Sequence, residues 1–531
     1  MNNENQSFLD TRTIVAVLLV GLTFVAWQSY MQKKYPETYA GKKSVAAQPA
    51  TETPTQPASG SVAQPSAPEA PVAVPHDEKL VHFSSDTLAF DISSRGMGIK
   101  AVQVLKYKTR SGQTVELGHG DGLLAFETRI IGHHEPLDFH IEQSSPNVFV
   151  GYAQVGRARI AKTVKIDPEK YVLDYQVVAE GADENFPGLT TALTEDIEPE
   201  SALSVLNPRR QKQEFFINTA EKKDRTLFGK DDVQKTFSNV RVASVGSQYF
   251  TQAIVDHSAI MPEAKADLSH ATKLASILLN YPVLNRGQKL ELDYMAFVGP
   301  KSLSLLQQVD ENLTLVVDFG FFNWIGRHIL DLLRWFYGLV GNWGVAIICL
   351  TVVVRLLVLP INIYSFKSMR AMQAIQPQIQ AMREKYKDDQ QKQQQEMMAL
   401  MRENKVNPVG GCLPALLQMP IFFALYQVLG NSIELYQAPF GLWIHDLSLK
   451  DPFYILPAFM GVTMFFQQKM TPNTMDPSQA KMMLMMPIIF TFFMISLPSG
   501  LSLYMLIGAL FSVVQQTYFL KQSKTLVSGS K

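Results

Sequence analysis

Residues 348–360 read ICLTVVVRLLVLP and contain one permanently charged side chain, Arg355, in a segment otherwise suited to a lipid bilayer. An arginine near the middle of a membrane costs on the order of 3 kcal/mol unless water, a phosphate or a carboxylate contacts it. A helical rise of roughly 1.5 Å per residue places Arg355 about 18 Å along the segment from Trp343. Two interpretations follow: the side chain extends to nearby headgroups, or it receives a polar group inside the membrane.

The second interpretation needs other polar side chains within the membrane. Thr351 lies one turn before Arg355 on the same helix face, and the later apolar segments add amides and a hydroxyl: Gln418, Gln427, Gln467, Gln468, Ser512, Gln515 and Gln516. If the helices turn these groups inward, they enclose a hydrated groove that is open to the cytoplasm. The same segments contain no Asp, Glu, Lys or His, which disfavours a proton-coupled transporter.

Five apolar segments form the carboxyl-terminal half and are each about long enough to span a bilayer, residues 343–360, 412–430, 453–468, 482–497 and 501–520. An earlier apolar run at 14–27 lacks the charge pattern and cleavage site of a signal peptide, so it predicts an uncleaved anchor. The sequence therefore predicts six transmembrane helices.

Positive charge predicts the orientation of these helices. Residues 361–407 carry eight Lys and Arg, whereas residues 431–452 carry only Lys450. By the positive-inside rule the first loop is cytoplasmic, and so is the carboxyl terminus, which leaves residues 80–300 outside. Over the whole chain 48 basic residues balance 48 acidic residues, so no global charge points to nucleic acid.

Residues 80–300 show a period of two, as in Leu173, Tyr175 and Val177, which predicts a large antiparallel β-domain. Its most ligand-like cluster is His133, His134 and Glu135. Neighbours on a strand point to opposite faces, so we expect a surface loop here and no metal site. Cys349 and Cys412 lie in apolar stretches without metal or redox spacing, which predicts buried thiols and no disulfide.

Two further helical patterns flank the first of the five spans. Residues 318–340 carry an apolar stripe that includes Ile329 and Leu333, which predicts an amphipathic helix in the membrane interface or, alternatively, packed on the β-domain. Residues 361–407 predict a helical hairpin. Its methionines would either bind varied apolar sequences or simply pack the hairpin: Met369, Met372, Met382, Met397 and Met398.

The chain is therefore expected to contain six parts. They are an anchor (1–34), a Pro/Ala-rich linker (35–79), a β-domain (80–317), an interfacial helix (318–340), a five-helix core (341–520) with its hairpin (361–407), and a tail (521–531). The predicted fold class is a polytopic α-helical membrane protein with an inserted all-β domain.

Four motifs of the carboxyl-terminal half resemble those of a known protein family. KVNPVGGCLPALLQMPIFFALYQVL (405–429), WIHDLSLKDPFYILPAFMGVTMFFQQKM (443–470), RLLVLP (355–360) and LPSGLSLYML (497–506) resemble the Oxa/Albino/YidC family of membrane protein insertases, in its Gram-negative form with a large periplasmic domain. The resemblance implies a groove that contains Arg355, lined by Thr351, Gln418, Tyr504, Met505 and Gln515. The family would have a second aromatic residue beside Tyr504, and this chain has Met505 there. The resemblance also implies that the β-domain is similar to galactose-mutarotase-like supersandwiches.

The resemblance also implies partners and location. We expect an inner-membrane insertase and chaperone that acts on nascent membrane proteins, alone or with the Sec translocon and its accessory subunits, and that contacts the ribosome and membrane lipids. It implies no catalytic residues, cofactor, metal or small-molecule substrate. A transporter and an envelope enzyme with its site in the β-domain are the alternative functions.

Overall fold

The computed structural model describes ten stretches of the chain, residues 78–118, 122–181, 186–197, 212–229, 231–282, 289–387, 389–404, 406, 413–471 and 477–528. The expected anchor, and the linker up to residue 77, lie outside the described residues. The described chain divides into two compact units, a β unit within residues 78–299 and a helical unit within residues 300–528.

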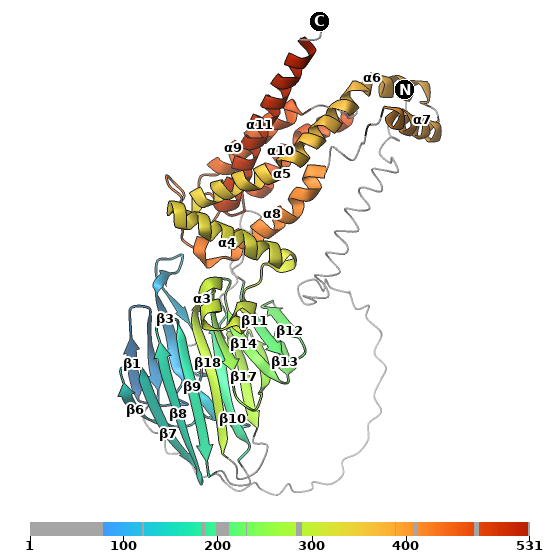
Figure 1. Ribbon diagram of the computed structural model, residues 1–531. Helices are drawn as coiled ribbons and strands as arrows, with labels where there is room; N and C mark the ends of the chain where they lie inside the picture. Colours follow the sequence, from blue (N-terminus) through green and yellow to red (C-terminus); the bar gives the residue numbers. More distant parts are fainter. Residues whose placement is uncertain are drawn as a thin grey trace, which may run out of the picture. The chain divides into compact units, whose positions relative to one another are not determined.

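The β unit consists of antiparallel strands (Figure 1). Their bounds are β1 Leu80–Ser84, β2 Leu88–Ser93, β3 Ile99–Lys108, β4 Thr114–Leu117, β5 Thr128–Ile130, β6 His140–Ser145, β7 Val148–Val155, β8 Ala158–Asp167, β9 Val172–Glu180, β10 Gly188–Asp196, β11 Glu214–Thr219, β12 Lys223–Leu227, β13 Val233–Phe237, β14 Val240–Gly246, β15 Phe250–Asp256, β16 Glu263–Ser269, β17 Leu274–Pro282 and β18 Leu290–Pro300. They form a nine-stranded sheet (β12-β11-β14-β15-β18-β9-β8-β7-β6), a five-stranded sheet (β13-β16-β17-β10-β5) and a four-stranded sheet (β1-β2-β3-β4).

Alternation along β9 places one side of that strand in the core, as the period of two predicts. Leu173, Tyr175 and Val177 on β9 are all at most 1% exposed. In the nine-stranded sheet Tyr175 pairs with Tyr294 of β18, and their rings stack with centroids 5.1 Å apart. The core of the β unit is therefore rich in aromatic side chains that hold neighbouring strands together.

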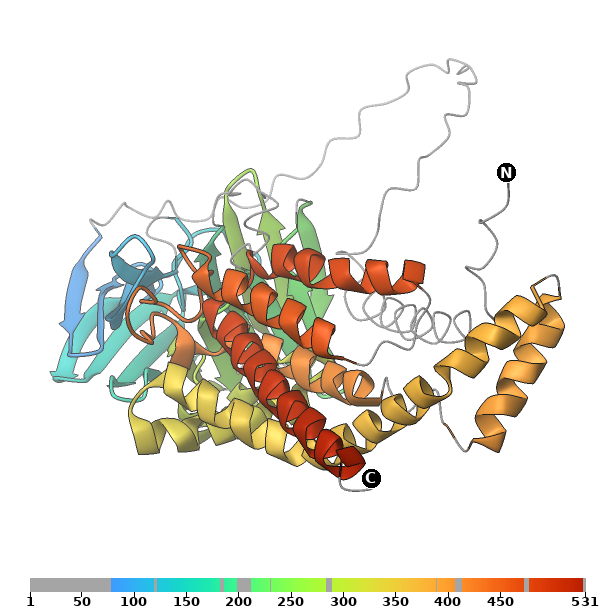
Figure 2. The ribbon, with the colours of Figure 1, turned by 90° about the horizontal axis from the view of Figure 1, so that it is seen from above.

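The helical unit contains the other elements. Their bounds are α3 Leu303–Val309, η1 Glu311–Val316, η2 Gly320–Phe322, α4 Asn323–Val340, α5 Trp343–Ala374, α6 Gln376–Lys385, α7 Gln390–Glu403, α8 Leu413–Asn431, η4 Ile433–Leu435, α9 Ile455–Met470, α10 Pro477–Met494 and α11 Ser499–Ser528. Helix α5 packs against α4, α8 and α11, and α9 packs against α10 and α11, as Figure 2 shows from above.

Three described helices, α5, α8 and α11, are long and apolar enough to cross a membrane. Helices α9 and α10 occupy the positions of the other two expected spans, but α9 has only 16 residues and the apolar part of α10 is Met483–Met494. Helix α5 also continues through Pro360, where the expected span ended. A proline removes one backbone donor and need not end a helix whose neighbours support it.

The amphipathic segment forms helix α4, and residues 300–317 before it belong to the helical unit. Its buried side chains include Ile329, Leu330 and Leu333, and α4 contacts α5 and α8. Its other face exposes large apolar groups, with Trp324 exposed at 68% and Leu339 at 64%. Such a face suits lipid contact more than contact with water.

Asp451 organises the loop before α9. Its carboxylate is buried and accepts hydrogen bonds from Trp443 Nε1 (3.0 Å) and from the backbone nitrogens of Phe453 (3.1 Å) and Leu456 (2.7 Å). The same loop holds the start of α11, because the backbone nitrogen of Gly500 donates to Leu447 O over 3.0 Å. The loop therefore sets where α9 and α11 begin.

Candidate functional site

Two helix faces meet around Arg355. Thr351 and Arg355 lie four residues apart on α5, and Tyr504, Gly508 and Ser512 follow one another at the same spacing on α11. Residues spaced by four lie on one face of a helix. Because α5 packs against α11, these two faces bring the cation of the first span to the polar groups of the last.

The guanidinium of Arg355 is bound to α11 on one side. Its Nη1 donates to Ser512 Oγ over 3.2 Å, and Ser512 Oγ donates in turn to Gly508 O over 3.0 Å. Its Nε is buried and has no hydrogen-bond partner among the described residues. No carboxylate of the described residues forms an ion pair with Arg355, whereas Arg334 on α4 is paired with Glu434.

Gln418 and Tyr504 form a second polar contact, one helical turn before Gly508 on α11. Gln418 Nε2 on α8 donates to the hydroxyl oxygen of Tyr504 over 2.6 Å, and Tyr504 is only 1% exposed. A partly buried amide and a buried phenol satisfy each other in this way at little net cost. The contact joins α8 to α11, so the site draws on three helices.

The remaining predicted groove residues are placed differently. Thr351 is fully buried, and its hydroxyl donates to Ile347 O of its own helix over 2.6 Å. Met505 and Gln515 are partly buried on α11. Gln427 accepts from Asn431 Nδ2 over 2.9 Å, and Gln516 donates to Thr471 Oγ1 over 3.2 Å. The structure thus groups Arg355 with Ser512, and Gln418 with Tyr504.

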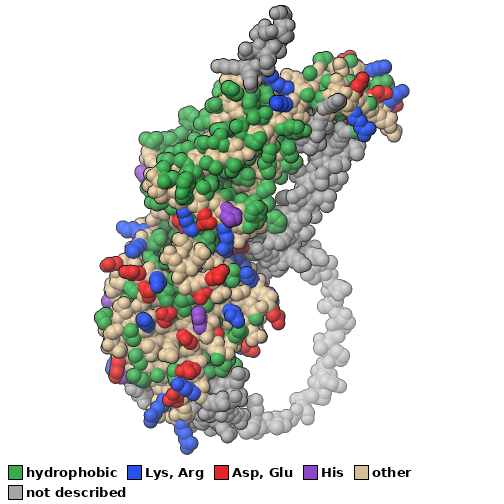
Figure 3. Space-filling view, in the orientation of Figure 1, with side chains coloured by type: hydrophobic (Ala, Val, Ile, Leu, Met, Phe, Trp, Pro, Cys, Tyr) green, Lys and Arg blue, Asp and Glu red, His purple; other side chains and the backbone are tan. Residues whose placement is uncertain are grey.

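Around the site, the helical unit presents an apolar exterior. In Figure 3 hydrophobic side chains cover much of the helical unit on the face shown, while charged side chains gather on the hairpin and on the β unit. Leu357 of α5 is exposed at 71% and Val514 of α11 at 70%. So much exposed apolar surface indicates a membrane environment.

The hairpin packs its own small core. Ile375, Ile379, Met401 and Val406 are buried together, and Met372 and Met397 pack partly against them. Met369 and Met382 are partly buried, whereas Met398 is exposed at 38%. Ordinary hairpin packing therefore accounts for Met372 and Met397, and Met398 is the methionine most accessible to another molecule.

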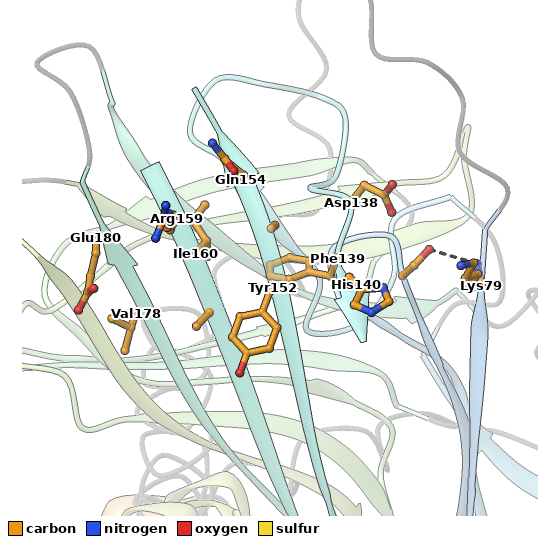
Figure 4. Close-up of a pocket in the computed structure, with 13 residues that line it drawn as sticks. Lys79, Asp138, Phe139, His140, Tyr152, Gln154, Arg159, Ile160, Val178 and Glu180 are labelled. Carbon is orange, nitrogen blue, oxygen red and sulfur yellow. Dashed lines mark hydrogen bonds between the residues drawn. The ribbon is translucent and has the colours of Figure 1, made fainter. Parts of the chain in front are cut away.

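The β unit contains a pocket of about 1000 Å³ on the nine-stranded sheet. Tyr152, Arg159 and Glu180 line it from the neighbouring strands β7, β8 and β9, as Figure 4 shows. Glu180 is ion-paired with Lys289 at 3.3 Å, and His140 lies 3.7 Å from Glu142. Glu180 and Glu142 are thus each matched by a neighbouring basic side chain.

The predicted surface loop is present: His133, His134 and Glu135 are exposed in the turn after β5. No group of three His, Cys, Asp or Glu that could hold a metal occurs within the described stretches. Cys349 is a partly buried free thiol on α5, and Cys412 lies outside the described residues.

The sequence reading did not identify Gly508 as part of the site and counted Ser512 only among the polar residues of the spans. Both lie on the face of α11 that carries Tyr504, and the four-residue spacing was visible in the sequence. What was not visible is that this face packs on Arg355, because packing between helices so distant in sequence has no local signal.

Comparisons with known proteins match both units. A family model described as 60Kd inner membrane protein matches residues 335–525, and one described as YidC periplasmic domain matches residues 80–332. The membrane protein insertase YidC of Geotalea daltonii is 32% identical over 544 residues, which cover 97% of this chain and 99% of the relative. The corresponding protein of a Shewanella species is 34% identical over 545 residues, which cover 94% and 96%.

Among solved structures, an active YidC insertase with its first transmembrane domain resolved covers 83% of this chain and 93% of its own, at 19% identity and a TM-score of 0.39. The two family models and the near full-length relatives settle the family: this chain belongs to the YidC membrane protein insertases.

Proposed function

We propose that this chain inserts nascent membrane proteins into the inner membrane and helps them fold, and that Arg355 binds polar or acidic parts of the client on their way through a groove. The observation that carries the proposal is the set of partners that the Arg355 guanidinium has and lacks. It is held by Ser512 on one side, it has no carboxylate partner among the described residues, and its Nε has no acceptor there. An arginine without a carboxylate partner in a membrane bundle suits a receptor for anionic or polar groups.

The strength of this attraction depends on water. A charge pair at contact contributes roughly 1 kcal/mol in bulk water and several kcal/mol where water is excluded. A groove that stays wet therefore attracts a client carboxylate without holding it tightly. Weak binding suits an insertase, which must release each segment into lipid.

The proposed topology has six spans, with the hairpin and the carboxyl terminus in the cytoplasm and the β unit in the periplasm. The eight basic residues of 361–407 support this orientation. We also assign the β unit to the supersandwich class and keep residues 1–34, 35–79 and 318–340 as anchor, linker and interfacial helix. The antiparallel sheets support the assignment of the β unit, and the exposed aromatic face of α4 supports that of the interfacial helix.

The proposed partners are nascent membrane proteins, lipids, the ribosome and the Sec translocon with its accessory subunits. The basic hairpin supports ribosome contact, since Lys and Arg neutralise RNA phosphates. The Sec partnership rests on the family resemblance alone.

Depleting the protein tests the proposed function as a whole. Quantitative proteomics of the inner membrane, on pulse-labelled cells, should show newly made multi-pass proteins failing to insert before older proteins decline. Complementation by the wild-type chain is the control. If newly made membrane proteins insert at the usual rate in depleted cells, this function is wrong.

A further inference from the structure

We propose that Gly508 and Ser512 form a seat on α11 that fixes the Arg355 guanidinium at one position inside the bundle, so that both are positioning residues for the client-binding cation. The inference rests on the proposed role of Arg355. The position of the guanidinium can nevertheless be measured without any client.

The first observation is the closeness of Arg355 to Gly508. A Cβ added at Gly508 would lie 2.4 Å from Arg355 Nη2, 3.1 Å from Cζ and 3.1 Å from Nε. Three atoms of the guanidinium group thus crowd the space that a side chain at 508 would occupy. The planar group rests on the helix backbone, and only glycine leaves room for it there.

The second observation is the orientation of the Ser512 hydroxyl. It donates its proton to Gly508 O over 3.0 Å, so its oxygen is free to accept from Arg355 Nη1 at 3.2 Å. A hydroxyl carries one donor and two acceptor sites, and here both kinds are used. Gly508 therefore supplies space and Ser512 supplies an oriented acceptor, four residues apart on one helix face.

The consequence is a cation that is held in the bundle and does not extend freely to the headgroups. A long arginine side chain loses considerable rotamer freedom when it is fixed, and a packed seat with a hydrogen bond offsets that loss. The seat occupies Nη1 and leaves Nε without an acceptor among the described residues.

Gly508→Ala is an informative variant because it should not damage the fold. Alanine is a better helix former than glycine by about 1 kcal/mol. The clash falls on the far end of a flexible side chain, so the protein relieves it by moving the guanidinium. Gly461→Ala is the matched control, since its Cβ would lie 2.3 Å from Thr491 Oγ1 between α9 and α10, away from Arg355.

The functional test is a double-mutant cycle on a client with an acidic translocated tail. Gly508→Ala should lower insertion about three- to tenfold at normal protein level, and it should cause no further loss in an Arg355→Ala background. Gly461→Ala should lower insertion equally in both backgrounds or not at all. Ser512→Ala should cause a smaller loss that Ser512→Thr restores. If Gly508→Ala has the same effect with and without Arg355, it acts through general packing and the seat is wrong.

The second test measures whether the guanidinium lies beside position 512. It uses a chain in which Ser512→Cys supplies the thiol to be measured and Cys349→Ala and Cys412→Ala remove the natural thiols. A cation beside a thiol favours the reactive thiolate, so the ratio of alkylation rates at pH 7 and pH 9.5 reports the presence of the guanidinium and cancels differences in access. Arg355→Ala should lower this ratio several-fold, and Gly508→Ala should lower it nearly as far. A ratio unchanged by Gly508→Ala would overturn the seat, whatever Arg355→Ala does to clients.

If Arg355→Ala inserts every client normally while the alkylation ratio still falls in Gly508→Ala, the seat is supported and the proposed client role of Arg355 is wrong. The two failures are therefore distinguishable.

Discussion

Arg355 on α5 donates to the hydroxyl of Ser512 on α11 across 3.2 Å, a contact between residues 157 positions apart in the chain. The first and last spans of the helical unit are thus joined at the one charged side chain of the apolar core segments. This contact explains how an arginine is kept inside the bundle without a carboxylate. Arg355 has no ion-pair partner among the described residues, and its proposed role depends on that feature.

Deleting residues 80–299 should leave insertion largely intact. The β unit is compact by itself, and Arg355, Ser512, Gln418 and Tyr504 all belong to the helical unit. The measurement is client insertion in cells that express only the deletion protein at matched level. Tyr152→Ala in the β pocket should likewise have no effect on insertion, and complete loss in either variant would place the function in the β unit.

Removing residues 365–404 should impair client recruitment more than the stability of the spans. The hairpin buries its own core, so its loss exposes little of the remaining bundle. Crosslinking of ribosome-bound nascent chains should fall several-fold, and the residual binding should be less sensitive to salt because basic residues are lost. A deletion protein that fails to accumulate would show that the hairpin is structural.

Two single substitutions separate client contact from hairpin packing among the hairpin methionines. Met398→Gln should weaken crosslinking and leave stability unchanged, because Met398 is exposed, whereas Met401→Gln should destabilise the hairpin because Met401 is 6% exposed.

Asp451→Ala should destabilise the helical unit by roughly 2 kcal/mol, because three donors lose a buried acceptor and one of them, the backbone nitrogen of Leu456, is itself buried. Asp446→Ala is the matched control in the same loop, since it loses only the bonds from Ser448. Tryptophan fluorescence can follow the unfolding, because no Trp lies within residues 80–299. Equal melting temperatures for the two variants would show that Asp451 does not organise the loop.

Asp256 should make the stability of the β unit depend on pH. Burial raises the pKa of Asp256 to about 6, although hydrogen bonds from Ser258 and Tyr281 oppose the rise. Because the folded pKa lies above the unfolded value, the stability contribution is complete below about pH 4 and is lost as the pH rises through 6. The loss is on the order of 2 kcal/mol after allowance for partial exposure.

Hydrogen exchange of β15 and β17 between pH 4.5 and 6.5, corrected for intrinsic rates, measures this contribution. Asp256→Asn should remove most of the dependence. An identical pH profile in the variant would assign the dependence to other groups.

The parts that were predictable from sequence are those with local periodicity. The period of two placed Leu173, Tyr175 and Val177 on one side of a strand, and all three are buried. Helical spacing placed Ile329 and Leu333 on one apolar stripe, which was expected to face the membrane interface or the β-domain. In α4 both are buried, and α4 contacts α5 and α8. The order of strands in the nine-stranded sheet has no such signal, since it depends on contacts between distant segments.

The same limit applies to the site. Hydropathy and the isolated charge were enough to single out Arg355, and Gln418 and Tyr504 came from the family motifs. The contact with Gly508 needed the packing of α11 on α5. Apolar composition ended the expected span at Pro360, and the structure continues the same helix, α5, to Ala374. A proline removes one backbone donor and need not end a helix.

The most direct test of the account is insertion of a client series that differs only in the charge of its translocated tail, in Arg355→Lys and Arg355→Ala backgrounds matched for protein level. Lys keeps the charge and much of the reach, so it should retain function. Ala should produce defects that grow with each added tail carboxylate, by up to about fivefold per roughly 1 kcal/mol of lost attraction, and most for weakly hydrophobic clients. Equal insertion in both backgrounds across the whole series would contradict the account and would reduce Arg355 to an anchor for headgroups.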